Sequence, residues 1–360
     1  MWNERGDSEA CWAARLTRFL IVTFAVCLGV APAMAANTLR IYQIDVEGGG
    51  AVLVVTPSGQ SMLIDAGSPP PPSGERDSKR IAAAMQAAGL TKINYLFTTH
   101  YDGDHVGGAV AANNLVHFDR FFDHGDPDMK YNQNKGINER FKGYSDIAAV
   151  KRTIVKPGDL IPLNGVRVQV VSSAGEVLKA AINGGGPNPL CQGAEQHDPD
   201  QTENSRATGV LLAYGKFTFL DLGDLTWDKE MALACPENKL GKVTLYMATH
   251  HGFFNDMSGA PAHVWAIQPQ VVIANNGPRK GLSQTAYEKI MKIPALDGLW
   301  QSHLALANDK AHNTAQEMIA NLEESQACQG HAIDVEVAAN GDSFTVTNTR
   351  NNFSKTYRTR

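Results

Sequence analysis

The chain has 360 residues, of which 43% are apolar and 19% are charged, a composition typical of a globular protein and not of a disordered one. Asp and Glu outnumber Lys and Arg by 37 to 32, and no run of basic residues breaks this acidic balance. A strong basic surface for binding nucleic acid is therefore excluded.

The first 35 residues have the pattern of a secretory signal peptide. Arg15 and Arg18 precede an apolar stretch over 19–31, and Ala33 to Ala35 supplies the small residues that a signal peptidase needs. The stretch is shorter than the roughly 20 residues of a membrane-spanning helix, which favours cleavage over an uncleaved anchor. We expect a mature chain, residues 36–360, that is periplasmic or extracellular, has no membrane span and keeps the net charge of −5.

Short strand-like and helix-like segments alternate from residue 38 onward. Two stretches, 124–150 and 183–205, are rich in Asn, Gly, Asp and Pro and predict long surface loops, which often carry function in compact proteins. The predicted strands are 39–46, 51–56, 61–65, 93–99, 118–122, 166–172, 208–214, 217–222, 243–248 and 271–275. The predicted helices are 81–88, 106–113, 227–234, 262–267 and 285–292.

The tail predicts a β-hairpin, with strands over 331–339 and 342–346. Asn340-Gly341 between them suits a two-residue type I′ turn. No stretch has the composition of a linker, so residues 36–360 are expected to form a single domain that ends in this hairpin.

The segment Thr99 to Gly108, THYDGDHVGG, is the strongest functional signal. It places His100, Asp102, Asp104 and His105 within six residues, directly after a buried apolar strand. Carboxylates gathered in a pocket repel one another unless a cation neutralises them. The pattern therefore predicts a metal site, and the alternative is a solvated loop.

Two later strands also end in metal-binding residue types. Asp224 follows the strand 217–222, where it could bridge two ions or cap the helix that begins at Trp227, a position that Thr226 could fill equally well. The strand 243–248 leads into His250 and His251. Because successive side chains of a strand alternate between faces, we predict one metal ligand, His250, and assign to His251 a contact with the substrate or a proton transfer; the register stays open.

The remaining histidines and cysteines carry weaker signals. His124 and His197 lie in the predicted loops and are expected to be solvated, and His303 is expected to be packed, with no indication for His312. Three cysteines of the mature chain permit one disulfide and leave one thiol, but the pairing cannot be read from the sequence. These are Cys191, Cys235 and Cys328.

These residues together resemble a metallo-β-lactamase superfamily hydrolase, most closely the periplasmic metallo-hydrolase domain of bacterial competence (DNA-uptake) channel proteins. The matching pieces are Ile64 to Gly67, Thr99 to Gly108, Glu203 to Ser205, Leu222 to Asp224 and His250 to Gly252. The resemblance implies an α/β (α+β) fold, the αββα sandwich, in which helices flank two mixed sheets. It also implies that His100 and Asp102 face one metal ion, Asp104 and His105 face another, and Asp224 bridges both.

Two departures from the superfamily pattern bear on the metal. Asp102 stands where the usual motif has histidine, as in the competence branch, and Asn204 and Ser205 stand where many members have a further histidine. One of the two metal positions is then short of a ligand, which leaves open whether one or two divalent ions bind. Donors of nitrogen and oxygen without thiolate suit zinc, manganese or iron, and the extra carboxylate shifts the preference towards manganese.

The sequence thus predicts a metal-dependent hydrolase. One or two ions would lower the pKa of a bound water from 15.7 towards about 7 and so form hydroxide. Asp104 would bind metal and orient this water, and His251 could protonate the leaving group. Asn204, Arg279 and Lys280 are candidate substrate-binding residues. Arg279 and Lys280 could bind a phosphate group. The alternative for these two residues is a solvated turn.

By resemblance, the leading substrate class is a phosphodiester, in single-stranded nucleic acid or in a small nucleotide. A lactone or another ester is the alternative within enzymes, because the fold hosts many chemistries. A secreted binding or scaffold protein with a vestigial metal site is the alternative from another functional class.

Overall fold

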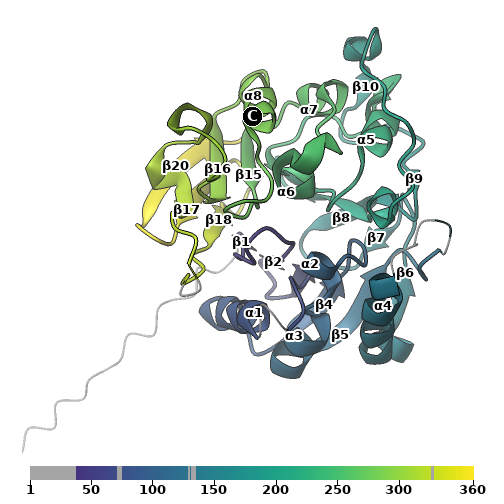
Figure 1. The fold of residues 1–360 in the computed structure, drawn as a ribbon, viewed down its shortest axis with the longest axis vertical. Helices are drawn as coiled ribbons and strands as arrows, with labels where there is room; N and C mark the ends of the chain where they lie inside the picture. Colours follow the sequence, from purple (N-terminus) through teal and green to yellow (C-terminus); the bar gives the residue numbers. More distant parts are fainter. Residues whose placement is uncertain (1–37, 71–74, 129, 131–134, 326–327) are drawn as a thin grey trace, which may run out of the picture. The chain divides into compact units, whose positions relative to one another are not determined.

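Two β-sheets packed face to face, with helices on both outer sides, make up the structure (Figure 1). The computed structural model describes residues 38–70, 75–128, 130, 135–325 and 328–360. The predicted signal peptide lies outside the described residues. The strand orders are β20-β19-β18-β1-β2-β3-β4-β5-β6 and β17-β16-β15-β14-β12-β11-β8-β7, with β9 beside β8. This mixed α/β architecture confirms the predicted fold class.

The first sheet joins the two ends of the described chain, because β1 lies between β2 and β18. Its strands are β1 (Leu39–Gln43), β2 (Val52–Val55), β3 (Ser61–Ile64), β4 (Ile93–Phe97), β5 (Phe118–Asp123), β6 (Arg152–Ile154), β18 (Ile333–Val337), β19 (Ser343–Asn348) and β20 (Phe353–Arg358).

The second sheet is parallel from β12 through β17 and antiparallel on the β11 side. Its strands are β7 (Leu160–Ile161), β8 (Arg167–Ser173), β9 (Glu176–Val177), β11 (Gly209–Tyr214), β12 (Phe217–Asp221), β14 (Leu245–Met247), β15 (Val271–Ala274), β16 (Gly298–His303) and β17 (Ile319–Asn321). A separate short pair consists of β10 (Gly186–Pro187) and β13 (Glu237–Asn238).

Three apolar layers hold the sandwich together. Val52 and Val54 of β2 point into the cluster between the sheets, whereas Leu53 and Val55 point to the outer helices. Successive side chains of a strand face opposite ways, so a strand covered on both sides is apolar throughout. This is why the central strands appear in the sequence as short continuous apolar runs.

The helices divide between the two outer faces (Figure 1). The first sheet is covered by α1 (Arg76–Ala87), α3 (Ala109–Val116) and α4 (Lys135–Ala148), and the second by α5 (Trp227–Ala234), α7 (Pro261–Ile267) and α8 (Gln284–Met291). Two short helices, α2 (Gly103–Val106) and α6 (Thr249–Phe253), begin just beyond strand ends. None of the helices in the described ranges is both long and apolar enough to cross a membrane.

The prediction of a loop over 124–150 is wrong, because this stretch contains α4. Ile137, Phe141, Tyr144 and Ala148 recur at intervals of three and four residues and pack against the first sheet. Because polar residues lie between them, the overall composition of this stretch does not reveal its narrow apolar face. The other predicted loop, 183–205, is largely irregular and holds only β10 and the 3₁₀ turns η2 (Pro189–Cys191) and η3 (Glu203–Arg206).

The tail also departs from the expected geometry. Strands β18 and β19 pair as a hairpin, but the turn spans 338–342 and only Gly341, at φ 73°, has the positive φ that both central residues of a type I′ turn require. A third strand, β20, extends the hairpin, and β16 is a further strand that sequence patterning missed. The single helix predicted over 106–113 is divided into α2 and α3 at Gly107 and Gly108.

Candidate metal centre

Strand ends from both sheets bring the predicted metal-binding residues together. His100 to His105 follow β4 of the first sheet, Asp224 follows β12 of the second, and His250 and His251 follow the neighbouring β14. The packing of the two sheets thus makes neighbours of segments that lie far apart in the sequence.

Four of these residues form a tight group. Asp104, His105, Asp224 and His251 each present one donor atom, and these atoms all lie within 4.8 Å of one another. The Nε2 atom of His105 is 3.2 Å from Asp224 Oδ1, and the Nε2 atom of His251 is 3.1 Å from Asp104 Oδ2 and 3.2 Å from Asp224 Oδ2. The arrangement offers two imidazole nitrogens and two carboxylates to a single cation.

The other predicted donors lie on a second side of Asp224. His100 Nε2 is 3.7 Å from Asp102 Oδ2 and 3.9 Å from Asp224 Oδ2, and His250 Nε2 is 3.4 Å from the same Asp224 oxygen. His100 Nε2 is buried without a hydrogen-bond partner among the described residues. A buried ring nitrogen without a partner is costly, so a cation bound beside Asp224 and Asp102 would fit this donor set.

Asp65 orients the centre and was not predicted as a site residue. Its Oδ2 atom is 2.6 Å from His105 Nδ1 and accepts a 2.7 Å hydrogen bond from the Thr99 hydroxyl. The same hydroxyl lies 2.9 Å from His100 Nδ1. Asp65 and Thr99 thus fix two imidazole rings with their Nε2 atoms towards Asp224, as outer partners of metal ligands usually do. The only signal for Asp65 in the sequence was its place in the Ile64 to Gly67 turn.

His250 and His251 both face Asp224, so the predicted alternation of their side chains between two faces is wrong. Alternation of faces holds for extended backbone. Here His250 and His251 have left-handed φ angles of 53° and 59°, followed by Gly252 at 85°. Of the two, His251 belongs to the tight group, whereas His250 was the predicted ligand.

Charge and burial set the protonation of the centre. Burial opposes ionisation of Asp224, but His105, His251 and His250 outweigh it and hold the pKa of Asp224 well below its usual value. Burial lowers the pKa of His250 to about 4. Metal binding requires ionised carboxylates and neutral imidazoles, and at neutral pH these two residues are in those states. Burial opposes protonation of His105, but Asp224, Asp65 and Asp104 outweigh it and raise the pKa of His105 well above its usual value, so His105 would release a proton when a metal ion binds.

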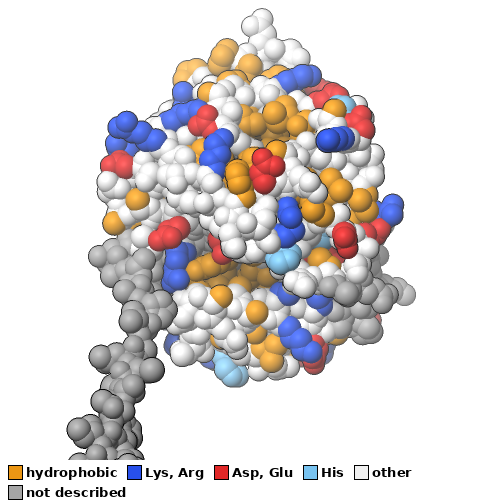
Figure 2. All heavy atoms as spheres, turned by 90° about the vertical axis from the view of Figure 1, so that its left-hand side faces the viewer, with side chains coloured by type: hydrophobic (Ala, Val, Ile, Leu, Met, Phe, Trp, Pro, Cys, Tyr) orange, Lys and Arg blue, Asp and Glu red, His pale blue; other side chains and the backbone are white. Residues whose placement is uncertain are grey.

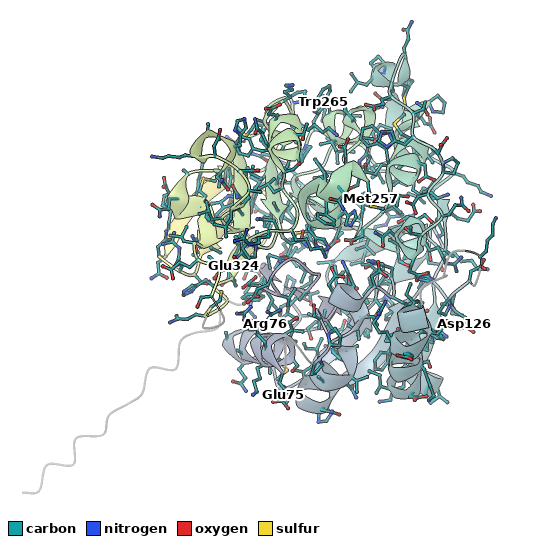
Figure 3. The ribbon with its side chains drawn as sticks, in the orientation of Figure 1. Glu75, Arg76, Asp126, Met257, Trp265 and Glu324 are labelled. Atoms are coloured by element: carbon teal, nitrogen blue, oxygen red, sulfur yellow. A yellow bond between two sulfur atoms is a disulfide. The ribbon has the colours of Figure 1, made fainter. Side chains whose placement is uncertain are left out.

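The three predicted substrate-binding residues differ in their surroundings. Lys280 forms an ion pair with Asp104 Oδ2 at the edge of the tight group. Arg279 is instead held by Glu324, labelled in Figure 3, at 2.8 Å and is 70% exposed. Asn204 lies buried on η3, and its Oδ1 atom has no hydrogen-bond partner among the described residues.

The other histidines lie outside the centre. The expectation that His124 is solvated is wrong, because its ring packs on Tyr101 and its Nε2 atom is 2.9 Å from Glu203 Oε1. His303 is buried, as expected, and bonds to Asp45. His197 and His312 are partly exposed.

Two smaller questions left open by the sequence are resolved. Thr226, and not Asp224, occupies the N-cap position of α5. The disulfide joins Cys191 to Cys235, and Cys328 keeps its thiol.

Comparison with known proteins matches residues 45–112 to the family model described as the metallo-β-lactamase superfamily. No curated protein matches the chain. Among solved structures, a metallo-β-lactamase from Cronobacter sakazakii is 15% identical, with 51% of this chain aligned and a TM-score of 0.32, and the chain spans 60% of its length. The metallo-β-lactamase fold protein YhfI from Bacillus subtilis is 10% identical, with 73% of this chain and 95% of that protein aligned and a TM-score of 0.42.

The family match covers the strands β2 to β4 and the whole THYDGDHVGG segment, which supplies four of the donors that the structure gathers. Residues 45–112 are therefore similar to the metallo-β-lactamase superfamily, whose members are typically metal-dependent hydrolases.

Proposed function

We propose that this chain is a periplasmic or extracellular metal-dependent phosphodiesterase that acts on single-stranded nucleic acid or nucleotides. The observation that carries the substrate class is Lys280, whose ammonium group lies beside the metal-binding carboxylate Asp104. A cation in this position can pair with a phosphate oxygen of a substrate whose scissile bond lies at the metal centre.

Two sets of residues would hold divalent ions, zinc or manganese. Asp104, His105 and His251 form one set, His100, Asp102 and His250 form the other, and Asp224 is common to both. The sequence suggested that one metal position lacks a ligand, because Asn204 stands where many superfamily members have histidine. In the second set, His250 would supply the missing donor. When bound, such ions provide a hydroxide nucleophile at neutral pH and polarise the bond that is cut.

The side chains around the ions divide the remaining work. His251, predicted to protonate the leaving group, has its Nε2 atom between Asp104 and Asp224, and we therefore assign it to metal binding. We assign to Lys280 the stabilisation of negative charge that develops on the substrate. Asp65 holds the His105 ring, which would direct its Nε2 atom towards a bound ion.

The competence-protein branch of the superfamily remains part of this proposal, supported by Asp102 at the second position of the motif. Figure 2 shows Lys and Arg side chains interspersed with Asp and Glu on one face of the molecule. Recognition of the substrate would then depend more on contacts at the metal centre than on an extended basic surface. This suits a nucleotide or a short single strand.

Metal content and phosphodiester cleavage by the purified chain test the proposal. We expect bound zinc or manganese by elemental analysis, cleavage of bis(p-nitrophenyl) phosphate, and loss of both after chelation and in Asp104→Ala. Asp119→Ala is the matched control, since Asp119 is partly exposed and pairs with Lys92 away from the centre.

Parallel assays of lactones and thioesters test the substrate class. Faster cleavage of a lactone than of any phosphodiester would contradict it and favour the ester alternative. A chain that binds no transition metal and is unaffected by Asp104→Ala would favour the scaffold alternative.

A further inference from the structure

A cavity of about 340 Å³ lies beside the metal centre, between η4 (Phe254–Asp256) and the loop that joins β15 to α8. Its walls include Phe254, Asn255, Leu282 and Ser283. The volume is at the lower end of the range for small-molecule sites, about 300–1,000 Å³, and suits one ring-sized group better than a long chain.

Two residues that line the cavity contact histidines of the centre. The ring of Phe254 stands edge-on to the His250 imidazole, with the centroids 5.5 Å apart. The Lys280 ammonium nitrogen is 5.8 Å from the centroid of the same ring. Gly281, which also lines the cavity, packs its backbone against the His251 carbonyl group. A phosphate paired with Lys280 would thus carry its attached group towards Phe254.

The residues on both sides of Phe254, which lines the cavity, have left-handed φ angles. Phe253, Asn255 and Asp256 have left-handed φ angles of 60°, 52° and 59°, whereas Phe254 has φ −54°. Phe253 is buried in the core at 1% exposure, and Phe254 beside it is only partly buried. Backbone strain of this kind concentrates at functional sites.

The charges around the cavity are already neutralised by partners. Arg279 makes two hydrogen bonds to the carboxylate of Glu324, and Asp256 pairs with Lys289; Figure 3 labels Glu324 and also Met257, the residue after Asp256. A neutral group suits this cavity better than an anion. Ser283 Oγ accepts a hydrogen bond from the Ala286 amide, so its hydroxyl proton can be donated to an acceptor on the edge of a ring.

We propose that this cavity is a subsite for a nucleobase joined through its sugar to the scissile phosphate, and that the ring of Phe254 stacks on the base. The inference rests on the proposed function and adds the specificity-determining residue. Stacking of a base on an aromatic side chain is worth about 1–3 kcal/mol, which corresponds to about 5- to 150-fold in affinity.

The test compares two substrates that differ only in their bases: oligothymidylate and the same phosphodiester chain built from abasic residues. We expect Phe254→Ala to lower kcat/KM about tenfold on oligothymidylate, mainly through KM, and to leave the abasic chain unaffected. Phe254→Trp should restore the preference. Phe353→Ala, at a partly exposed aromatic residue on β20, is the control for a general loss of packing.

Equal losses on both substrates, or no loss on either, would overturn the inference. Equilibrium binding of adenosine monophosphate to the manganese-loaded protein, by calorimetry, separates this outcome from failure of the proposed function. Even if no phosphodiester is cleaved, about tenfold weaker binding by Phe254→Ala at unchanged metal content supports the subsite. Unchanged binding contradicts it.

Discussion

At the scale of single residues, the candidate centre depends on a buried carboxylate surrounded by imidazoles. Asp224 has Nε2 atoms of His105, His250 and His251 within 3.4 Å and that of His100 at 3.9 Å. The rings of His105 and His100 are oriented from their far sides by Asp65 and Thr99. The outer partners are therefore the residues whose replacement probes the centre without removing a donor to the metal.

Asp65→Asn should weaken metal binding, because it removes the carboxylate that orients the His105 ring. Loss of such an outer partner typically costs about 10- to 100-fold in metal affinity or activity. Competition with a chromogenic chelator measures the affinity. Asp77→Asn is the matched control, since Asp77 is equally buried but pairs with Arg76 and belongs to neither group of candidate metal ligands; an equal loss in both variants would argue against an orienting role.

Glu230→Gln should change how stability depends on pH. Burial raises the pKa of Glu230 from 4.5 to about 8, although the carboxylate accepts hydrogen bonds from the Gly259 and Ala260 amides. The folded state therefore retains a proton between pH 4.5 and about 8 that the unfolded state has lost, and stability falls as pH rises through this window.

Relative to the parent chain, Glu230→Gln should therefore gain in melting temperature as pH rises from 5 to 9. Each unit of pKa shift corresponds to about 1.36 kcal/mol, so the gain should reach a few kcal/mol at the alkaline end. Thermal unfolding across the pH range measures it. A constant difference between the two proteins would show that Glu230 keeps its ordinary ionisation.

At the scale of elements, the segment after β14 holds its left-handed backbone through contacts with the loop before α8. A Cβ atom at Gly281 would lie 1.8 Å from the His251 carbonyl oxygen. Gly281→Ala should therefore displace His251 and reduce bound metal and activity together. Gly184→Ala is the control, because Gly184 has a similar φ of 73° but open space around it, and it should show only the effect of backbone strain on melting temperature.

The sequence predicted the elements that are covered on both sides, because their apolar runs are continuous. It identified His100 to His105 through spacing and the Asp224 and His251 strand ends through position. It could not predict Asp65 as an orienting group, because a single buried carboxylate has no periodic signature. The direction of the His250 and His251 side chains depends on left-handed backbone angles. These angles occur together with a close contact between His251 and Gly281, and the local sequence does not encode a contact between such distant residues.

At the scale of the whole molecule, the centre lies where the two sheets meet, with donors from β4 on one side and from β12 and β14 on the other. A bound ion would thus link the two sheets. An ion that binds only the folded state stabilises it by about 2.7 kcal/mol at a hundred times its dissociation constant. We expect chelation to lower the melting temperature of the parent chain, measured by calorimetry, and zinc or manganese to restore it.

Asp224→Asn serves as the reference for this experiment, because it removes the carboxylate common to both donor sets. Its melting temperature should be insensitive to chelator and to added metal. A chelator effect of equal size in this variant would place the stabilising ion elsewhere.

The pairing of β1 with β18 sets Leu39 opposite Val337. During vectorial synthesis, the first strand of the sheet emerges long before the neighbour on its outer side exists. Until the final hairpin arrives, that bare edge is open to pairing with other copies of the nascent chain. The edge of β1 is therefore the part of the first sheet that is most open to misassembly until residues 333–348 have been synthesised.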